Sequence, residues 1–110
     1  MLEGVLYTVV SREDSAATVR LLPESPIYKA HFPGYPITPG VTLLQMALEL
    51  MDRKLVSAKE IKFLSPVFPL DGAVVRFEWT FKEEGAVAVS LLAEDGSQYA
   101  KMSLTVCPAQ

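Results

Sequence analysis

Residues 39–54, PGVTLLQMALELMDRK, decide the fold, because they predict one long helix that is apolar almost all the way round. Pro39 suits the first helical position, where its missing N–H costs no hydrogen bond, and Thr38 can cap the helix. The polar side chains are spaced by three, four and three residues and form one narrow stripe: Thr42, Gln45, Glu49 and Asp52. The simplest interpretation of this stripe is a solvent-facing edge. We predict a buried helix that ends at about Lys54, where Arg53 and Lys54 complement the helix dipole.

Strands flank this helix on both sides in the sequence. Residues 2–10 and 16–22 are rich in β-branched and aromatic side chains, and the polar turn at 11–15 predicts a hairpin. After a strand near residues 58–64, three segments alternate apolar and polar side chains and are joined by short turns: 75–81, 87–91 and 99–106. The helix and these strands must bury each other, because the chain offers no other partner. We predict an α+β fold in which an antiparallel sheet of about six strands wraps around one central helix, as a single domain over residues 1–110.

Prolines crowd the segment that leads into the helix. Four of them fall between residues 23 and 36, at Pro23, Pro26, Pro33 and Pro36. Because proline removes a backbone donor and fixes φ, this density predicts a stiff loop without regular structure.

The composition predicts a small folded protein and argues against several function classes. Half of the 110 residues are hydrophobic and 21% are charged, with a formal net charge of −3. The Lys and Arg residues are scattered, which argues against a nucleic-acid surface. No apolar run has the length of a bilayer span and the N-terminus lacks a signal peptide's basic start, so we expect no membrane association. A chain of this size buries a smaller share of its surface than a large domain does, so we also expect pairing with another copy.

Cys107 is the only Cys of the chain and His31 is its only His. An internal disulfide is therefore impossible, which favours a reducing, cytoplasmic location. One His and one Cys do not make a credible metal site, and the sequence has no phosphate loop or dinucleotide fingerprint. We expect neither a metal nor a cofactor.

His31 and the start of the helix form a candidate site. A lone histidine is more often structural or exposed to solvent, but here a proline-rich loop leads from it directly to the helix. At that point the N–H groups of Gly40 and Val41 have no intrahelical acceptor, and Gly40 lets a substrate atom approach the backbone closely. The imidazole would take a proton α to a carbonyl while the N–H groups hold the enolate oxygen.

The stretch HFPGYPITPG at residues 31–40 resembles the core motif H-F-x-G-x-P-x-x-P-G of the β-hydroxyacyl-thioester dehydratases of fatty-acid synthesis. Residues 59–71, KEIKFLSPVFPLD, are similar to the family's segment that ends in P-V-x-P-x-D. The resemblance implies a hotdog fold and a homodimer, or a higher homo-oligomer, with active sites in a tunnel between subunits. It implies acyl substrates on acyl carrier protein or coenzyme A, as in lipid metabolism. It also implies that His31 is catalytic, that the Gly40 N–H binds the thioester oxygen, and that the substrate lies against Val41, Phe32 and Pro39.

The chain departs from the family at two positions on the polar stripe. The family places a Glu or Asp fourteen residues after its His and tends to place a Gln one turn later, but this chain has Gln45 and Glu49 there. A Gln side chain cannot deliver a proton to a leaving hydroxide. The leading hypothesis is a (3R)-hydroxyacyl-thioester dehydratase, a hydro-lyase, in which Glu49 replaces the acid about 5–6 Å further along the helix.

Two alternatives stay open at this stage. The first is a hotdog acyl thioesterase, in which Gln45 orients a water molecule that His31 or Glu49 activates. The second is a non-catalytic homologue that binds acyl carriers without turning them over, and it rests on Gln45 alone.

Overall fold

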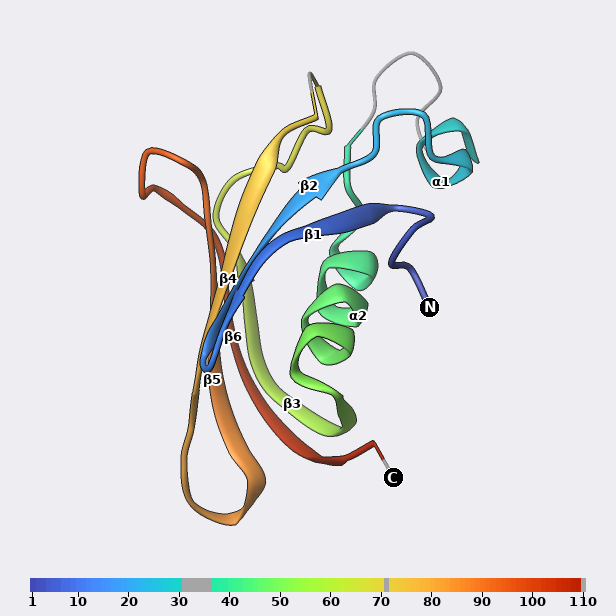
Figure 1. The fold of residues 1–110 in the computed structure, drawn as a ribbon. Coiled ribbons are helices and arrows are strands. Elements are labelled where there is room, and N and C mark those ends of the chain that lie inside the picture. Colours follow the sequence, from blue (N-terminus) through green and yellow to red (C-terminus); the bar gives the residue numbers. More distant parts are fainter. Residues whose placement is uncertain (31–36, 71, 110) are drawn as a thin grey trace.

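The computed structural model describes residues 1–30, 37–70 and 72–109. Its strands are β1 (Tyr7–Glu13), β2 (Ala16–Leu21), β3 (Arg53–Phe63), β4 (Val74–Phe81), β5 (Ala86–Leu92) and β6 (Gln98–Pro108). Its helices are α1 (Pro26–Ala30), α2 (Gly40–Met51) and the short 3-10 helix η1 (Glu83–Gly85). The strands form one sheet in the order β1-β2-β4-β5-β6-β3, and every neighbouring pair is antiparallel. Figure 1 shows the sheet curling around α2, so the predicted α+β hotdog architecture is confirmed.

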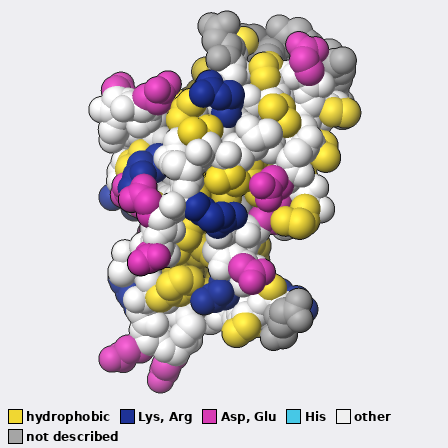
Figure 2. Space-filling model, viewed as in Figure 1, with side chains coloured by type: hydrophobic (Ala, Val, Ile, Leu, Met, Phe, Trp, Pro, Cys, Tyr) yellow, Lys and Arg dark blue, Asp and Glu magenta, His cyan; other side chains and the backbone are white. Residues whose placement is uncertain are grey.

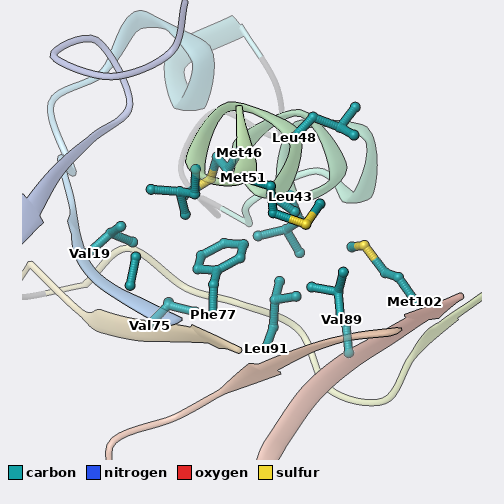
Figure 3. Close-up of a cluster of buried hydrophobic side chains, with 14 of the residues drawn as sticks. Val19, Leu43, Met46, Leu48, Met51, Val75, Phe77, Val89, Leu91 and Met102 are labelled. Atoms are coloured by element: carbon teal, nitrogen blue, oxygen red, sulfur yellow. The ribbon is translucent and has the colours of Figure 1, made fainter. Parts of the chain in front are cut away.

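The core lies between α2 and the concave face of the sheet. In Figure 3 the side chains of Val75, Phe77 and Leu91 point from the strands toward the helix, and all three are fully buried. The alternation predicted for β4 is confirmed as far as Trp79, which is also buried, whereas Phe81 at the strand end is 44% exposed. The helix contributes six buried side chains: Leu43, Met46, Ala47, Leu48, Leu50 and Met51. Each large apolar side chain buried in this way stabilises the fold by about 1.5–3 kcal/mol, so packing, more than helix propensity, holds α2 in place.

The helix α2 is shorter than predicted. It ends at Met51 because Asp52 adopts the left-handed conformation (φ 56°, ψ 53°), and the Asp52 N–H donates back to the Glu49 carbonyl at 3.1 Å. Arg53 and Lys54, predicted at the helix C-terminus, are therefore the first residues of β3. Arg53 still serves the helix end, because its Nη1 donates to the Met51 carbonyl at 3.0 Å. Among the described residues, no helix has both the length and the apolar character needed to cross a bilayer.

The start of α2 also differs from the prediction. Pro39 occupies the N-cap position, and no side chain caps the helix there. Thr38, the predicted cap, is instead buried, with its Oγ1 2.9 Å from the hydroxyl of Tyr28. The Thr42 hydroxyl donates to the Pro39 carbonyl at 2.6 Å. The entry of the chain into α2 is thus held by contacts with α1 that the local sequence pattern does not contain.

The prediction that residues 23–36 contain no regular structure is wrong for Pro26–Ala30, which form α1. Pro26 takes the first helical position, where a missing N–H costs nothing. Ser25 acts at the N-terminus of this helix: its Oγ accepts from the Ile27 N–H at 3.3 Å and its carbonyl accepts from the Tyr28 N–H at 3.1 Å. Tyr28 is buried in the core, which fixes this turn.

The first strand begins later than predicted, at Tyr7 instead of Leu2. Residues 2–6 form a tight turn in which the Leu6 N–H donates to the Leu2 carbonyl at 2.7 Å and Gly4 has a positive φ of 85°. Glycine adopts this conformation without steric cost. The strand then runs through the predicted turn residues as far as Glu13. The turn brings the N-terminal end of the chain beside α2, as Figure 1 shows.

Candidate functional site

The predicted site residues that the structure describes all lie at the start of α2 or along it. Pro39 and Gly40 begin the helix, and Val41, Gln45 and Glu49 follow on its outward side. His31 and Phe32 lie outside the described residues. The described part of the site therefore consists of the helix start and the polar stripe.

An apolar cavity of about 570 Å³ opens at the start of α2. Pro39 and Gly40 lie in its wall, together with Leu43 and two further segments, 37–38 and 63–67. The Pro39 carbonyl accepts from the N–H groups of Thr42 and Leu43 at 3.1 and 3.2 Å, which starts the helical pattern. The N–H groups of Gly40 and Val41 precede this pattern and so have no acceptor within the helix. They can serve as donors to an oxygen atom, and Gly40 lines the cavity.

Gly40 is in close contact with the aromatic ring of Phe63 at the end of β3. A Cβ atom at position 40 would lie 2.5 Å from the ring Cζ and 2.8 Å from Cε2. These distances are far below ordinary carbon contacts of about 3.5–4.0 Å. Glycine at position 40 is therefore required for Phe63 to cover the helix start.

A second groove, of about 540 Å³, lies along the outward side of α2. Gln45 and Glu49 line it between apolar side chains of the same helix. Figure 3 shows Leu48 pointing away from the sheet, and this side chain also lines the groove. The remaining lining residues come from both chain ends and from the start of β3: Met1, Val41, Leu44, Asp52, Arg53, Lys54, Leu55 and Ala109.

The predicted polar stripe is the outward edge of α2. Gln45 and Asp52 are exposed, and Glu49 is half-buried. The helix is less enclosed than predicted, because Val41 is 74% exposed at its first turn. An apolar side chain with this exposure at the mouth of a groove is available to a ligand or to another protein chain.

The carboxylate of Glu49 is the most heavily hydrogen-bonded group of the groove. It accepts from the Leu2 N–H with both oxygens at 3.0 and 2.9 Å, and from the Glu3 N–H at 3.3 Å. The Tyr7 hydroxyl donates to it at 3.0 Å and the Gln45 Nε2 at 3.0 Å. Burial raises the pKa of Glu49, but these hydrogen bonds outweigh it and leave the pKa below its ordinary value. Burial, followed by the hydrogen bond and the negative charge of Glu49, raises the pKa of Tyr7.

The contacts of Glu49 with Leu2 and Tyr7 were not predicted from the sequence. Both partners belong to the segment assigned to the first strand, 47 and 42 residues away from Glu49. A local pattern carries no signal for such a contact. The Gln45–Glu49 contact, in contrast, follows from the spacing of four residues on one helix face.

The helix start and the polar stripe face different spaces in the single chain. Gly40 lines the first cavity, whereas Val41, Gln45 and Glu49 line the second groove. Strand β3 connects the two, since its first residues line the groove and its last residue, Phe63, lines the cavity. Within the described residues, the chain does not bring Gly40 and Gln45 to one common cavity.

Strand β3 is an edge of the sheet and is unusually exposed. It contains 11 residues and occupies the end of the strand order, next to β6. The large apolar side chains Leu55, Val56 and Phe63 are 39%, 61% and 53% exposed. On the face of the molecule seen in Figure 2, hydrophobic side chains are interspersed with charges of both signs. A long sheet edge that exposes apolar side chains is available for pairing with another chain.

Comparison with known proteins gives one family and many structures of the same fold. The model of the ApeI-like family, described as ApeI dehydratase, matches residues 8–103. No curated protein sequence matches the chain. The dehydratase heterocomplex ApeI:P from Xenorhabdus doucetiae is similar in structure, with a TM-score of 0.71 and 18% identity over 92% of this chain and 97% of that one.

Two further structures extend the similarity to different activities. The dehydratase domain from the CurF module of curacin polyketide synthase has a TM-score of 0.61 and 16% identity, over 94% of this chain and 43% of that one. A hypothetical thioesterase from Streptococcus pneumoniae, solved with coenzyme A, has a TM-score of 0.56 and 13% identity, over 91% and 86%. At these identities the similarity concerns the fold alone, and this fold carries both dehydratases and thioesterases.

Proposed function

This chain belongs to the ApeI-like dehydratase family, whose model matches residues 8–103, and from this premise we propose that it dehydrates (3R)-hydroxyacyl thioesters. The acyl group is carried by acyl carrier protein or coenzyme A, and the products are a 2-enoyl thioester and water. The observation that carries this proposal is Gly40 at the first turn of α2, in the wall of an apolar cavity. An apolar cavity suits an acyl chain, and a helix start suits an oxygen that gains negative charge.

The proposed reaction is an elimination across the bond between Cα and Cβ of the acyl group. His31 takes the Cα proton, the electrons of that bond form the double bond, and the bond from Cβ to oxygen breaks. The N–H groups of Gly40 and Val41 stabilise the negative charge that develops on the thioester oxygen. Pro39 lines the same cavity as Gly40, and we assign it and Phe32 to the surface that contacts the acyl chain.

In this proposal the leaving hydroxyl receives its proton from His31 and not from Glu49. Glu49 accepts hydrogen bonds from four donor groups, which stabilises its ionised form. Its pKa lies below the ordinary value, so it carries no proton to give at neutral pH. One imidazole that takes the Cα proton and returns it to the hydroxyl balances the reaction, because water then leaves with both hydrogens.

We propose that two copies complete the site by pairing along β3. This strand is a long sheet edge with exposed apolar side chains, and it borders both the cavity of Gly40 and the groove of Gln45. Pairing along this edge would cover Val56 and the half-exposed Phe63. It would also bring the cavity of one copy toward the groove of the other, which a single chain does not do.

Light scattering after gel filtration tests the assembly. We expect a dimer for the wild type and a monomer for Val56→Lys, because pairing would bury the charge placed at this apolar position. Val10→Lys is the matched control, since Val10 is 53% exposed on the opposite edge strand, β1. A wild type that is monomeric would contradict self-pairing and would favour a different hotdog chain as partner, as in the heterocomplex found among the similar structures.

The activity is tested by the reverse reaction, hydration of a short 2-enoyl thioester of coenzyme A or of acyl carrier protein. We expect the 3-hydroxyacyl thioester as product and loss of turnover in His31→Ala. Circular dichroism shows whether the variant is still folded. Hydration that persists in a folded His31→Ala variant would contradict the proposal.

A thioesterase is the second candidate, and Gln45 is the observation that favours it. An amide on the groove can orient a water molecule for attack on a thioester but cannot act as a general acid. Release of free thiol from acyl-coenzyme A without any enoyl product would support this activity. If the chain binds the acylated carrier but shows neither activity, it is instead a non-catalytic homologue that binds acyl carriers.

A further inference from the structure

The groove along α2 is closed on one side by the N-terminal segment, residues 1–7, and one carboxylate holds that segment in place. Glu49 accepts from the backbone N–H groups of Leu2 and Glu3 and from the Tyr7 hydroxyl, at distances between 2.9 and 3.3 Å. Tyr7 is 1% exposed, so this end of the segment is part of the core. Met1 then extends along the groove as a lining residue. The N-terminal segment is thus held beside the groove by the hydrogen bonds of Glu49, and Met1 lines the groove.

The same carboxylate determines which atom of Gln45 faces a ligand. An ionised carboxylate can only accept hydrogen bonds, so the group at 3.0 Å from Glu49 Oε2 must be the Nε2 of Gln45. The amide is planar, and its Oε1 therefore points away from Glu49. Within the described part of the chain, no hydrogen bond engages this oxygen. The apolar neighbours Val41 and Leu48 leave Oε1 as the acceptor that this part of the groove offers.

We propose that Glu49 is a positioning residue that holds the amide of Gln45 with Oε1 toward the groove and joins the N-terminal segment to the site. Gln45 then supplies a hydrogen-bond acceptor for a hydroxyl group, either the 3-hydroxyl of the substrate or an attacking water. The exchange of Gln45 and Glu49 relative to the family pattern thus has a physical result. The carboxylate of Glu49 holds the N-terminal segment, and the amide of Gln45 offers a hydrogen-bond acceptor. The catalytic consequence rests on the proposed function, whereas the geometry of the amide does not.

Amide NMR of 15N-labelled protein tests the geometry independently of activity. The sequence contains three Gln and no Asn, so the side-chain NH2 region holds only the pairs of Gln45, Gln98 and Gln110. Gln45→Leu assigns the first pair by its disappearance. We expect the Gln45 pair to shift as Glu49 is protonated at acidic pH.

Two variants separate the positioning of Gln45 from simple support of the fold. Glu49→Gln is expected to move the Gln45 pair at neutral pH. Tyr7→Phe removes another donor to the same carboxylate, so we expect a lower Tm with the Gln45 pair unchanged. The titration of the wild type needs only the assignment from Gln45→Leu and decides the matter even if Glu49→Gln does not fold. If the NMR signals of the Gln45 NH2 pair do not shift when Glu49 changes its ionisation, the proposal is overturned, whatever reaction the enzyme catalyses.

A double-variant cycle on kcat tests the consequence for catalysis. We expect Gln45→Leu and Glu49→Gln each to lower kcat on the order of tenfold, the effect of one hydrogen bond in a reacting complex. The double variant should be no more than about twofold slower than Gln45→Leu, because Glu49 acts through Gln45. The losses in Tm should be less than additive, because both substitutions remove the same hydrogen bond. If the losses in kcat of the two single variants multiply in the double variant, the positioning role of Glu49 is refuted. If the wild type shows no turnover at all, the proposed function is refuted, while the NMR result still stands.

Discussion

Replacement of Gly40 by Ala should damage activity far more than stability. The new Cβ would meet the Phe63 ring at 2.5, 2.8 and 3.1 Å, so the ring must retreat by about 1 Å to reach an ordinary contact. Phe63 is 53% exposed in the single chain, at the end of a sheet edge, so its ring has more room to move than a core side chain. We therefore expect the cost at the lower end for overpacking, about 1–2 kcal/mol. For a domain of this size each 1 kcal/mol lowers Tm by about 4–8 °C, so we expect a loss of about 4–16 °C.

The effect on turnover follows from the position of the new methyl group. It stands at the cavity wall beside the N–H group proposed to bind the thioester oxygen. A misplacement of the reacting group by about 1 Å can cost about 10²-fold in rate. We expect a loss of this size in kcat/KM for hydration of an enoyl thioester, measured together with thermal unfolding by circular dichroism.

A second substitution shows whether the contact with Phe63 causes the loss of stability. Phe63→Leu removes the ring atoms nearest to position 40, so Gly40→Ala combined with Phe63→Leu should regain most of the lost Tm. Phe63→Leu alone is the matched control. If the losses in Tm of the two single variants simply add in the double variant, the contact with Phe63 does not cause the loss of stability. If Gly40→Ala keeps full kcat/KM, the catalytic role assigned to Gly40 is refuted.

Three further predictions concern the core and the Glu49 anchor. Phe77→Ala should lower the free energy of unfolding by about 3–5 kcal/mol in urea titrations, since Phe77 is fully buried between the sheet and α2; a loss below 1 kcal/mol would contradict this packing. Tyr7→Phe should cost about 1–2 kcal/mol, because it removes a hydrogen bond to a charged acceptor; an unchanged urea midpoint would argue against that bond. Folding lowers the pKa of Glu49 from its ordinary value of 4.5. The ionised Glu49 side chain therefore stabilises the fold above pH 4.5, and this stabilisation is lost as the pH falls through the pKa of the folded state. The stability of Glu49→Gln should accordingly depend less on pH in the acid range, and a slope equal to that of the wild type would count against the anchor.

The extent of local structure was predicted well where one strong periodicity covered a whole element. Val75, Phe77 and Trp79 alternate with polar residues and all three are buried in β4. The boundaries were predicted less well, because they depend on single residues. Asp52 takes a left-handed conformation and ends α2 three residues before Lys54, and Ser25 stabilises a helix inside a proline-rich segment. The helix after Ser25 is also fixed by Tyr28, which is buried in the core, and no local pattern contains that contact.

The sequence by itself determined the identity of the main elements, the spacing of Gln45 and Glu49 on one helix face, and the motif around Gly40 that indicates the family. These properties are local, since they depend on the period of a helix or strand and on neighbours within a few residues. Only the tertiary structure decided that the helix start and the polar stripe face separate spaces, and that Glu49 anchors Leu2 and Tyr7. The physical reason is that hydrophobic periodicity encodes which face of an element is covered, but the curvature and register of the sheet determine which distant segment covers it.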